Sequence, residues 1–464
     1  MTRHIVIVGG GFGGTTLARR LERRLPAPWQ LTLVSEESTT TFNPLLAEVV
    51  GASVFPEQVV APIRQMLKKS RFVMGRVTHV DALSRTVRAH TLAGERELPF
   101  DHLVLALGTR ARLDLLPGLA EHALPLKLVG DAMFIRNRVL HRLARMELES
   151  DRAQRRRLGS FIVMGGGFSG VEVAGALADF TQGALRCYPR VRADEISVAL
   201  LHDGARLLPE LPECLGDAAA RSLVQRGVKV QLLARVAAVQ AQGVVLADGS
   251  RVEGDTVVCT LGTRENPLLA QLAAHAGVQG GLALQRGRLP TAPDMSVPGW
   301  PGEGRLWALG DCALVPNGGD GASPPTAQFA VAQARVLADN LVAAVHGQPT
   351  RAFSHRSRGM MATTGHLKGV AQVFGLRLAG LPAWLLWRAY YLLLMPTAGR
   401  KLRIWVEWTW SMLFSVDVTH LRFTRTSEAD AEPAPGPASV PMPAPPASSP
   451  VHPPSISQGE RHAA

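Results

Sequence analysis

The stretch His4-Ile5-Val6-Ile7-Val8-Gly9-Gly10-Gly11-Phe12-Gly13-Gly14 decides the fold. Its apolar half predicts a short buried strand, and the residues from Thr15 to Leu25 favour a helix. Glycines spaced as G-x-G-x-x-G suit a dinucleotide, because the first makes a tight turn, the second lets backbone approach a pyrophosphate, and the third lets the helix pack on the strand. The pyrophosphate would lie at the helix N-terminus. The residues that we predict to bind it are Gly9, Gly11, Phe12, Gly13 and Gly14.

The same pattern occurs a second time in the chain. The strand-like run Phe161-Ile162-Val163-Met164 leads into Gly165-Gly166-Gly167-Phe168-Ser169-Gly170. One glycine-rich turn is a weak signal, but two predict two dinucleotide sites, which is usual where a nicotinamide reduces a flavin. The residues that we predict in the second site are Gly165, Gly167, Phe168 and Gly170.

A strand pattern downstream of each loop repeats as well. Asp101–Arg110 and Asp255–Arg264 both place an aspartate, a buried-strand run and then Gly-Thr-Arg in the same register. Two unrelated buried parallel strands that end in glycine would look similar, but repetition in register favours two related nucleotide-binding units. We therefore add Gly108 and Gly262 to the predicted nucleotide-binding residues.

The length of 464 residues exceeds what one hydrophobic core supports and suggests two or three domains. We predict an α/β fold with two Rossmann-like domains, the second inserted in the first. The run Leu306–Asp311 reads as a strand that returns to the first domain, which then comprises residues 1–120 and 285–345. The second domain comprises residues 121–284 and a C-terminal region residues 346–427. The Pro/Ala/Ser-rich residues 428–464 are expected to be disordered.

Charge and cysteine content exclude several function classes. The net charge is +12, but no nucleic-acid-binding motif accompanies it, so we expect no nucleic-acid partner. The four cysteines (Cys187, Cys214, Cys259 and Cys312) are widely separated and form no C-x-x-C. This spacing favours a reducing compartment and argues against a catalytic dithiol or a metal site.

Over about residues 3–423, the chain resembles the type II NADH:quinone oxidoreductases, a group of flavoprotein reductases that bind two dinucleotides. The segments that carry the resemblance are Phe42–Leu46, the Gly165 loop with Val171–Gly175, Ala308–Asp311, Pro325–Gln328 and Ala383–Arg388. It implies FAD on the first loop, NADH as substrate on the second, and a membrane quinone as the acceptor of two electrons, without proton pumping. We expect a cytoplasmic protein that is peripheral on the inner face of the cell membrane.

The resemblance also implies roles for individual residues of the first site. Glu36, which follows the second strand, is the candidate for the adenosine ribose, and Asp311 for the ribityl chain of FAD. In sequence, an ordinary glutamate in a surface turn would look the same as Glu36, and a helix-capping aspartate would look the same as Asp311. Pro44 and Leu45 would pack near the flavin ring, although both could equally be core residues.

The second site departs from the family pattern. Where the family usually has a glutamate for the NADH ribose, this chain has His202 followed by Asp203. We keep NADH and place Asp203 in the site, because its carboxylate would repel the 2′-phosphate of NADPH. Glu172 matches a family glutamate near nicotinamide and quinone, and Gln328 a family glutamine at the quinone; both are predicted catalytic. Gln333 is a doubtful quinone contact, because it follows Gln328 by five positions rather than four.

The segment Leu381–Phe414 predicts contact with a membrane surface. It holds Trp384, Trp387, Trp405, Trp408 and Trp410 with interspersed cations, but no apolar run of roughly 20 residues that could span a bilayer. Such helices suit the bilayer interface. A core helix pair or a homodimer interface could use the same residues. Two other functions stay open: a soluble NAD(P)H-dependent reductase of an iron–sulfur protein, which would not need this segment, and a slow flavin-bound redox sensor.

Overall fold

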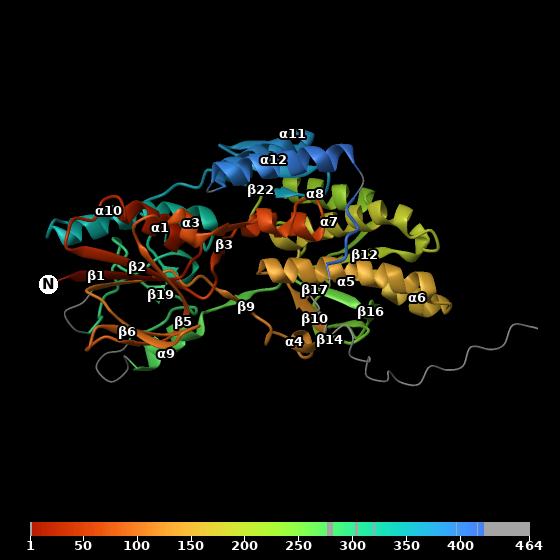
Figure 1. Ribbon diagram of the computed structural model, residues 1–464. Helices are drawn as coiled ribbons and strands as arrows, with labels where there is room; N and C mark the ends of the chain where they lie inside the picture. Colours follow the sequence, from red (N-terminus) through yellow and green to blue (C-terminus); the bar gives the residue numbers. More distant parts are fainter. Residues whose placement is uncertain are drawn as a thin grey trace, which may run out of the picture. The chain divides into compact units, whose positions relative to one another are not determined.

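The first glycine loop belongs to a seven-stranded sheet (Figure 1). The computed structural model describes residues 2–275, 282–301, 305–318, 321–395, 397–414 and 416–421. In spatial order the strands are β20 (Arg305–Ala308), β8 (His102–Leu105), β1 (Arg3–Val8), β2 (Trp29–Ser35), β5 (Arg71–Asp81), β6 (Thr86–Thr91) and β7 (Gly94–Pro99). The first five are parallel, and β6 and β7 continue the sheet antiparallel.

The chain returns to this sheet after leaving it for almost two hundred residues. β20 pairs in parallel with β8, with Leu306 opposite Leu103. The helices α1 (Phe12–Leu21) and α10 (Ala327–Val345) then pack on each other, and the side chains of Leu17, Leu21 and Leu337 are fully buried. The buried strand expected at Leu306–Asp311 is therefore present, and the segment after it closes the first sheet's core.

The second glycine loop belongs to a separate five-stranded sheet, in which every strand is parallel. Its order is β10 (Ala123–Pro125), β17 (Thr256–Cys259), β11 (Ser160–Met164), β12 (Ser197–Leu201) and β13 (Val228–Gln231). Its helices are α5 (Val129–Leu148), α6 (Arg152–Leu158), α7 (Phe168–Ala184) and α8 (Glu213–Gln225). Two parallel sheets, each with a glycine loop at the end of a central strand, are typical of two dinucleotide-binding units.

Short elements connect and extend these sheets. The two Gly-Thr-Arg repeats meet, because β9 (Arg110–Ala111) pairs antiparallel with β18 (Thr263–Arg264). The other elements are β3 (Thr39–Thr41), α2 (Leu46–Val50), β4 (Val60–Pro62), α3 (Ile63–Met66), α4 (Leu119–His122), β14 (Val236–Gln240), β15 (Gly243–Leu246), β16 (Arg251–Glu253), α9 (Pro267–His275), β19 (Leu289–Pro290) and β21 (Ala313–Leu314).

The C-terminal region consists of an antiparallel sheet and a helix pair. The sheet contains β22 (Gly359–Thr363), β23 (Gly369–Val373) and β24 (Leu376–Gly380), and the helices are α11 (Leu381–Leu394) and α12 (Ala398–Leu413). No helix in the described part of the chain is both long and apolar enough to cross a membrane. The tail predicted at residues 428–464 lies outside the described residues.

The tryptophans of the helix pair divide between the interior and the surface. Trp384, Trp387 and Trp408 are buried, whereas Trp405 and Trp410 are more than half exposed. The Arg388 guanidinium carbon lies 3.8 Å from the ring centroid of Trp384 and 4.8 Å from that of Trp408, and its Nη1 donates to the Trp408 carbonyl. This stack holds α12 against α11. The segment therefore combines two of the sequence alternatives, a core helix pair on one side and an exposed aromatic face on the other.

We predict that Gly175→Ala destabilises the junction between α7 and the C-terminal sheet. A Cβ at Gly175 would lie 2.6 Å from the carbonyl oxygen of Thr364, in the turn between β22 and β23. Backbone must move to admit it, so the free energy of unfolding should fall by about 1–3 kcal/mol. Thermal and urea denaturation measure the change.

Gly130→Ala in α5 is the matched control. A Cβ there meets no atom within 4 Å, and Gly130 has no positive φ. Its stability should be unchanged or higher by about 0.5 kcal/mol, because alanine restricts the unfolded chain. Equal stabilities for the two variants would contradict the close packing of α7 on the β22–β23 turn.

Candidate functional site

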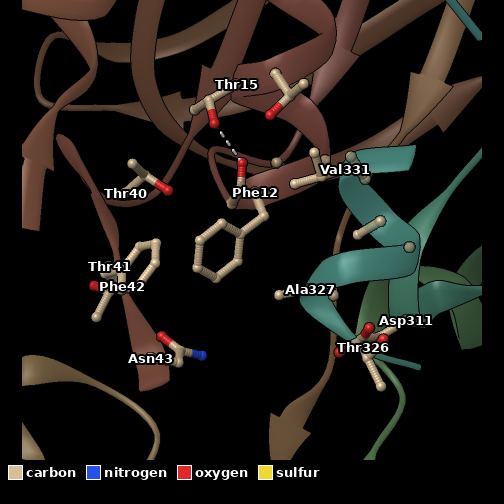
Figure 2. A pocket seen from close by; sticks show the side chains of 18 of the residues that line it. Phe12, Thr15, Thr40, Thr41, Phe42, Asn43, Asp311, Thr326, Ala327 and Val331 are labelled. Atoms are coloured by element: carbon tan, nitrogen blue, oxygen red, sulfur yellow. Dashed lines mark hydrogen bonds between the residues drawn. The ribbon is translucent and has the colours of Figure 1, made fainter. Parts of the chain in front are cut away.

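One large cavity, of about 1670 Å³, brings together most of the residues predicted from the sequence. Figure 2 shows Phe12, Thr40, Phe42 and Asn43 on one wall, with Asp311, Thr326 and the α10 residues Ala327 and Val331 opposite. The predicted residues that line it are Gly9, Gly11, Phe12, Gly13, Glu36, Pro44, Gly108, Asp311, Phe168, Glu172 and Gln328. Both glycine loops thus contribute to the same cavity.

The three glycines of the first loop have the backbone geometry that their spacing predicts. Gly9 has φ +118°, a backbone conformation that only glycine adopts without strain. A Cβ at Gly14 would overlap the carbonyl oxygen of Gly9, whereas a Cβ at Gly11 would meet nothing within 4 Å. Gly11 is the N-cap of α1 and has no side-chain cap, so the first amides of the helix are available to an anion.

The second loop repeats this arrangement at the N-terminus of α7. Gly165 has φ +111°, a Cβ at Gly170 would overlap the Gly165 carbonyl oxygen, and Gly167 faces open space. His202 follows β12 and packs on this loop, where the Gly166 amide donates to its Nδ1 at 3.2 Å. The same nitrogen lies 3.3 Å from Asp203 Oδ1.

Glu36, which follows β2, and Arg110, the arginine of the first Gly-Thr-Arg, form a charged end of the cavity. Glu36 comes directly after β2, as expected for a ribose ligand. Its carboxylate accepts from Arg110 Nη2 at 2.5 Å and lies 3.4 Å from Arg76 Nη2. Two arginines therefore position the Glu36 carboxylate. They use part of the hydrogen-bonding capacity of its oxygens.

A polar group in the cavity wall lacks a partner. The Oγ1 of Thr40 is buried and has no hydrogen bond to any described residue, although Thr40 lines the cavity (Figure 2). Next to it, Asn43 and Pro44 line the cavity, whereas Leu45 is fully buried beneath them and does not reach it.

Aromatic rings connect the cavity to the C-terminal helices. The ring centroid of Phe42 lies 5.3 Å from that of Phe12 and 5.8 Å from that of Tyr391. Tyr391 in turn lies 4.8 Å from Trp387 of α11. This side of the cavity is apolar and lies against α11, so it suits an apolar ligand better than a phosphate.

Glu172 joins three elements inside the protein. It lies on α7, and its Oε1 accepts from the Thr363 amide of β22 at 3.2 Å and from Trp387 Nε1 of α11 at 3.1 Å. Burial raises the pKa of Glu172 to about 8; the charge of Glu48 adds to the rise, and the two hydrogen bonds oppose it. The carboxyl is therefore mostly protonated at neutral pH, and because both donors approach Oε1, the proton lies on Oε2.

The two glutamines of α10 differ as their spacing suggests. Gln328 is half-buried, lines the cavity and accepts from the Ser357 hydroxyl at 3.2 Å. Gln333 is buried beneath the helix, and its Oε1 accepts from the Gly310 amide at 2.7 Å. Gln333 therefore supports the turn that carries Asp311 and does not line the cavity.

Comparison with known proteins identifies the family. The family model described as pyridine nucleotide-disulphide oxidoreductase matches residues 3–334, well over half of the chain. The chain belongs to the pyridine nucleotide-disulphide oxidoreductase family. Members of this family use FAD and NAD(P)H.

Named relatives of this oxidoreductase include two type II NADH:quinone oxidoreductases of Mycobacterium tuberculosis. Ndh is 30% identical over 89% of this chain and 88% of its own length, and NdhA is 32% identical over 89% and 87%. The fold matches NDH2 from Plasmodium falciparum, solved in complex with NADH, with a TM-score of 0.84 and 18% identity over 90% of this chain and all of that one. The resemblance predicted from the sequence is confirmed.

Five residues predicted in the oxidoreductase's second site do not line the cavity: Gly165, Gly167, Gly170, Asp203 and Gly262. Gly165 and Gly170 form the turn and the helix contact described above, and Gly262 (φ +51°) follows β17. Asp203, after β12, is exposed, with 69% of its side-chain surface accessible. It lies at the carboxyl end of the parallel sheet, where nucleotides bind in such folds.

Sequence reasoning missed Lys127. It follows β10 and lines the cavity, and its Nζ donates to the Thr109 hydroxyl at 3.2 Å. Burial lowers the pKa of Lys127, and Asp311 opposes the change. Burial likewise raises the pKa of Asp311, and Lys127 and Arg288 oppose that rise. Lys127 comes from the inserted unit and Asp311 from the first, so only the folded arrangement reveals this pair.

We predict that Glu172→Gln reduces the pH dependence of stability. At pH values between the ordinary pKa of 4.5 and the raised pKa of about 8, Glu172 keeps its proton in the folded protein but releases it in the unfolded chain. The native protein therefore loses stability from this group as pH rises through that window. Glutamine cannot ionise but can still accept from Thr363 and Trp387.

Thermal midpoints of both proteins at pH 5, 6, 7 and 8 provide the measurement, and other titrating groups cancel in the difference. The midpoint of the native protein should decrease more than that of Glu172→Gln. Parallel curves would show that Glu172 ionises normally in the folded state.

Proposed function

We propose that the protein is an NADH:quinone oxidoreductase that binds FAD at the first glycine loop and NADH at the second. The observation that carries this proposal is the shared cavity, whose wall includes the Gly9 loop, the N-terminus of α7 at Phe168 and Glu172, and an apolar side against α11. Two nucleotides and a third, apolar reactant can therefore meet at one place.

The residues present fit FAD. An uncapped helix N-terminus beside open Gly11 suits the pyrophosphate, and Glu36 follows β2, the position from which such folds bind a ribose. Asp311 would meet the ribityl chain, and Pro44 would contact the ring, with Leu45 supporting it from below. When bound, FAD would accept a hydride from a nicotinamide and pass two electrons to a second acceptor.

The chain's own groups would handle charge and protons. Lys127 offers a buried cation beside the proposed flavin position, where it can offset negative charge gained on reduction. Glu172 holds a proton on Oε2 at neutral pH, available to a quinone that needs protons as it gains electrons. Gln328, on the cavity wall, would orient a quinone carbonyl.

Asp203 supports NADH as the nicotinamide substrate. Its exposed carboxylate follows β12, the strand end that usually carries the ribose-binding acid, and would repel a 2′-phosphate. The Nδ1 of His202 is not free to bind a phosphate, because it lies 3.2 Å from the Gly166 amide nitrogen and 3.3 Å from Asp203 Oδ1.

The direct test measures both half-reactions separately. Mixed anaerobically with the purified holoprotein, NADH should bleach the flavin faster than NADPH does. A water-soluble quinone should then restore the oxidised spectrum within turnover time. Rapid bleaching without reoxidation by any quinone would favour the reductase of an iron–sulfur protein, and slow bleaching by both nicotinamides would favour a redox sensor.

Gly11→Val should give a folded protein without flavin. Its Cβ meets no protein atom within 4 Å but would occupy the position proposed for the pyrophosphate. We expect at least a hundredfold loss of FAD affinity, with the circular dichroism spectrum retained, and flavin absorbance of the purified protein measures it. Gly14→Val is the contrast, because its side chain overlaps the Gly9 carbonyl and should prevent folding. A flavin-replete Gly11→Val protein would refute the site.

We also propose that the exposed face of α12 holds the protein peripherally on a membrane, on the inner face of the cell membrane. Leu402, Trp405, Trp410 and Leu413 are all more than half exposed there, and aromatic and aliphatic side chains of an amphipathic helix insert into the bilayer interface. A soluble reductase would gain nothing from this face.

Trp405→Ser/Trp410→Ser should fold, since both side chains are largely exposed, but should float with vesicles much less than the native protein does. We expect at least a tenfold loss, because each buried aromatic contributes considerable apolar area. Loss of a dimer in size-exclusion chromatography, with flotation unchanged, would assign the face to a homodimer instead.

A further inference from the structure

Several arginines that the proposed nucleotide and quinone sites do not use line the same cavity. Arg19 and Arg20 lie on α1, Arg23 follows that helix, and Arg335 lies on α10, which packs along α1. Arg20, Arg23 and Arg335 are exposed. Apolar residues that line the cavity from α1 and α10 include Phe12 and Val331 (Figure 2).

The neighbouring acids are already engaged. Asp339 of α10 forms salt bridges with Arg24 and Arg351. Within the described ranges, Arg20, Arg23 and Arg335 form no salt bridge. Their positive charge is therefore uncompensated by the protein.

A turn adds two further cations beside α1. Glu22, directly after the helix, accepts from the backbone amides of Lys68 and Lys69 at 3.0 and 3.1 Å. Both lysines are exposed. We call the resulting surface the basic rim. It consists of Arg19, Arg20, Arg23, Lys68, Lys69 and Arg335.

The basic rim is structurally linked to α12. The 3₁₀ turn Pro56–Gln58 contacts α12, where Arg400 donates to the Glu57 carbonyl and Glu407 accepts from the Phe55 amide at 2.9 Å. From that turn the chain runs through β4 and α3, which contacts α1, to Lys68 (Figure 1). A short, hydrogen-bonded segment therefore connects the exposed apolar helix to the cationic mouth of the cavity.

We propose that the basic rim binds the anionic headgroups of bilayer phospholipids, so that the mouth of the cavity between α1 and α10 lies at the membrane surface. The arginines and lysines of the basic rim lie on several elements, so they suit many phosphate groups that are each bound weakly. The apolar residues of the cavity behind them would admit an acyl or isoprenoid chain rather than a further anion. This inference rests on the membrane docking by α12 proposed above, but it assigns a second, electrostatic contact to a different surface.

The test compares vesicles of phosphatidylcholine alone with vesicles containing one quarter phosphatidylglycerol, using the full-length holoprotein in flotation at 0.1 M salt. The triple variant Arg20→Gln/Arg23→Gln/Arg335→Gln should lose about a hundredfold in affinity for the anionic vesicles, since each cation near such a surface contributes roughly a factor of five. Its binding to phosphatidylcholine vesicles should be unchanged. The triple lysine variant at the same positions should bind both vesicles as the native protein does.

The control Arg96→Gln/Arg152→Gln/Arg251→Gln removes the same charge from exposed positions on β7, α6 and β16 and should bind both vesicles normally. An equal loss in this control, equal binding of the native protein to both vesicles, or loss of anionic binding in the lysine variant would overturn the proposal. Tight binding to a single-stranded oligonucleotide without preference for anionic vesicles would also overturn it. Turnover of the native protein with a water-soluble quinone, without vesicles, separately tests the proposed function, which can fail while the vesicle result stands.

Discussion

The two hydrogen bonds to Glu172 Oε1 hold the functional parts of the molecule together. One comes from β22 and the other from α11, while Glu172 itself lies near the N-terminus of α7, directly behind the second glycine loop. A buried carboxyl tolerates such a position only when its oxygens are hydrogen-bonded or protonated. The same burial that makes the contact structurally important keeps a proton on the group near neutral pH. Structure and proton chemistry thus follow from one desolvated side chain.

Close packing at glycines is the second constraint. Gly14 and Gly170 let each helix approach the turn that precedes it, and Gly175 lets α7 approach the β22–β23 turn. Since α7 carries the second glycine loop at one end and Glu172 one turn further on, its position relates that loop to the C-terminal region. Any side chain at Gly175 would disturb that relation without touching a ligand.

The sequence predicted what depends on local spacing. The glycine pattern identifies both loops because the first and third glycines of each loop meet a local steric demand, whereas Gly11 and Gly167 face open space. The five-residue spacing of Gln328 and Gln333 separates a residue that lines the cavity from a buried one. The family resemblance located Glu172, but its pKa follows from Thr363, Trp387 and Glu48, which are distant in sequence.

Properties that depend on tertiary placement were not predictable. The electrostatic interaction of Lys127 with Asp311 depends on the fold, because Lys127 follows β10 of the second sheet and Asp311 follows β20 of the first. Three of the five tryptophans of the C-terminal segment are interior, because the stack on Arg388 and the bond to Glu172 require them there. The composition of the segment alone indicated either a helix pair at a membrane surface or one in the protein core.

The central claim is that nicotinamide and quinone use one cavity in which Glu172 supplies a proton. The most direct measurement is the single-turnover rate at which a water-soluble quinone reoxidises the prereduced holoprotein between pH 6 and 9.5, for the native chain and for Glu172→Gln. The account predicts a native rate that falls about tenfold per pH unit above roughly pH 8, and a slower rate in Glu172→Gln that does not vary with pH in that range. Superimposable profiles for the two proteins would contradict it.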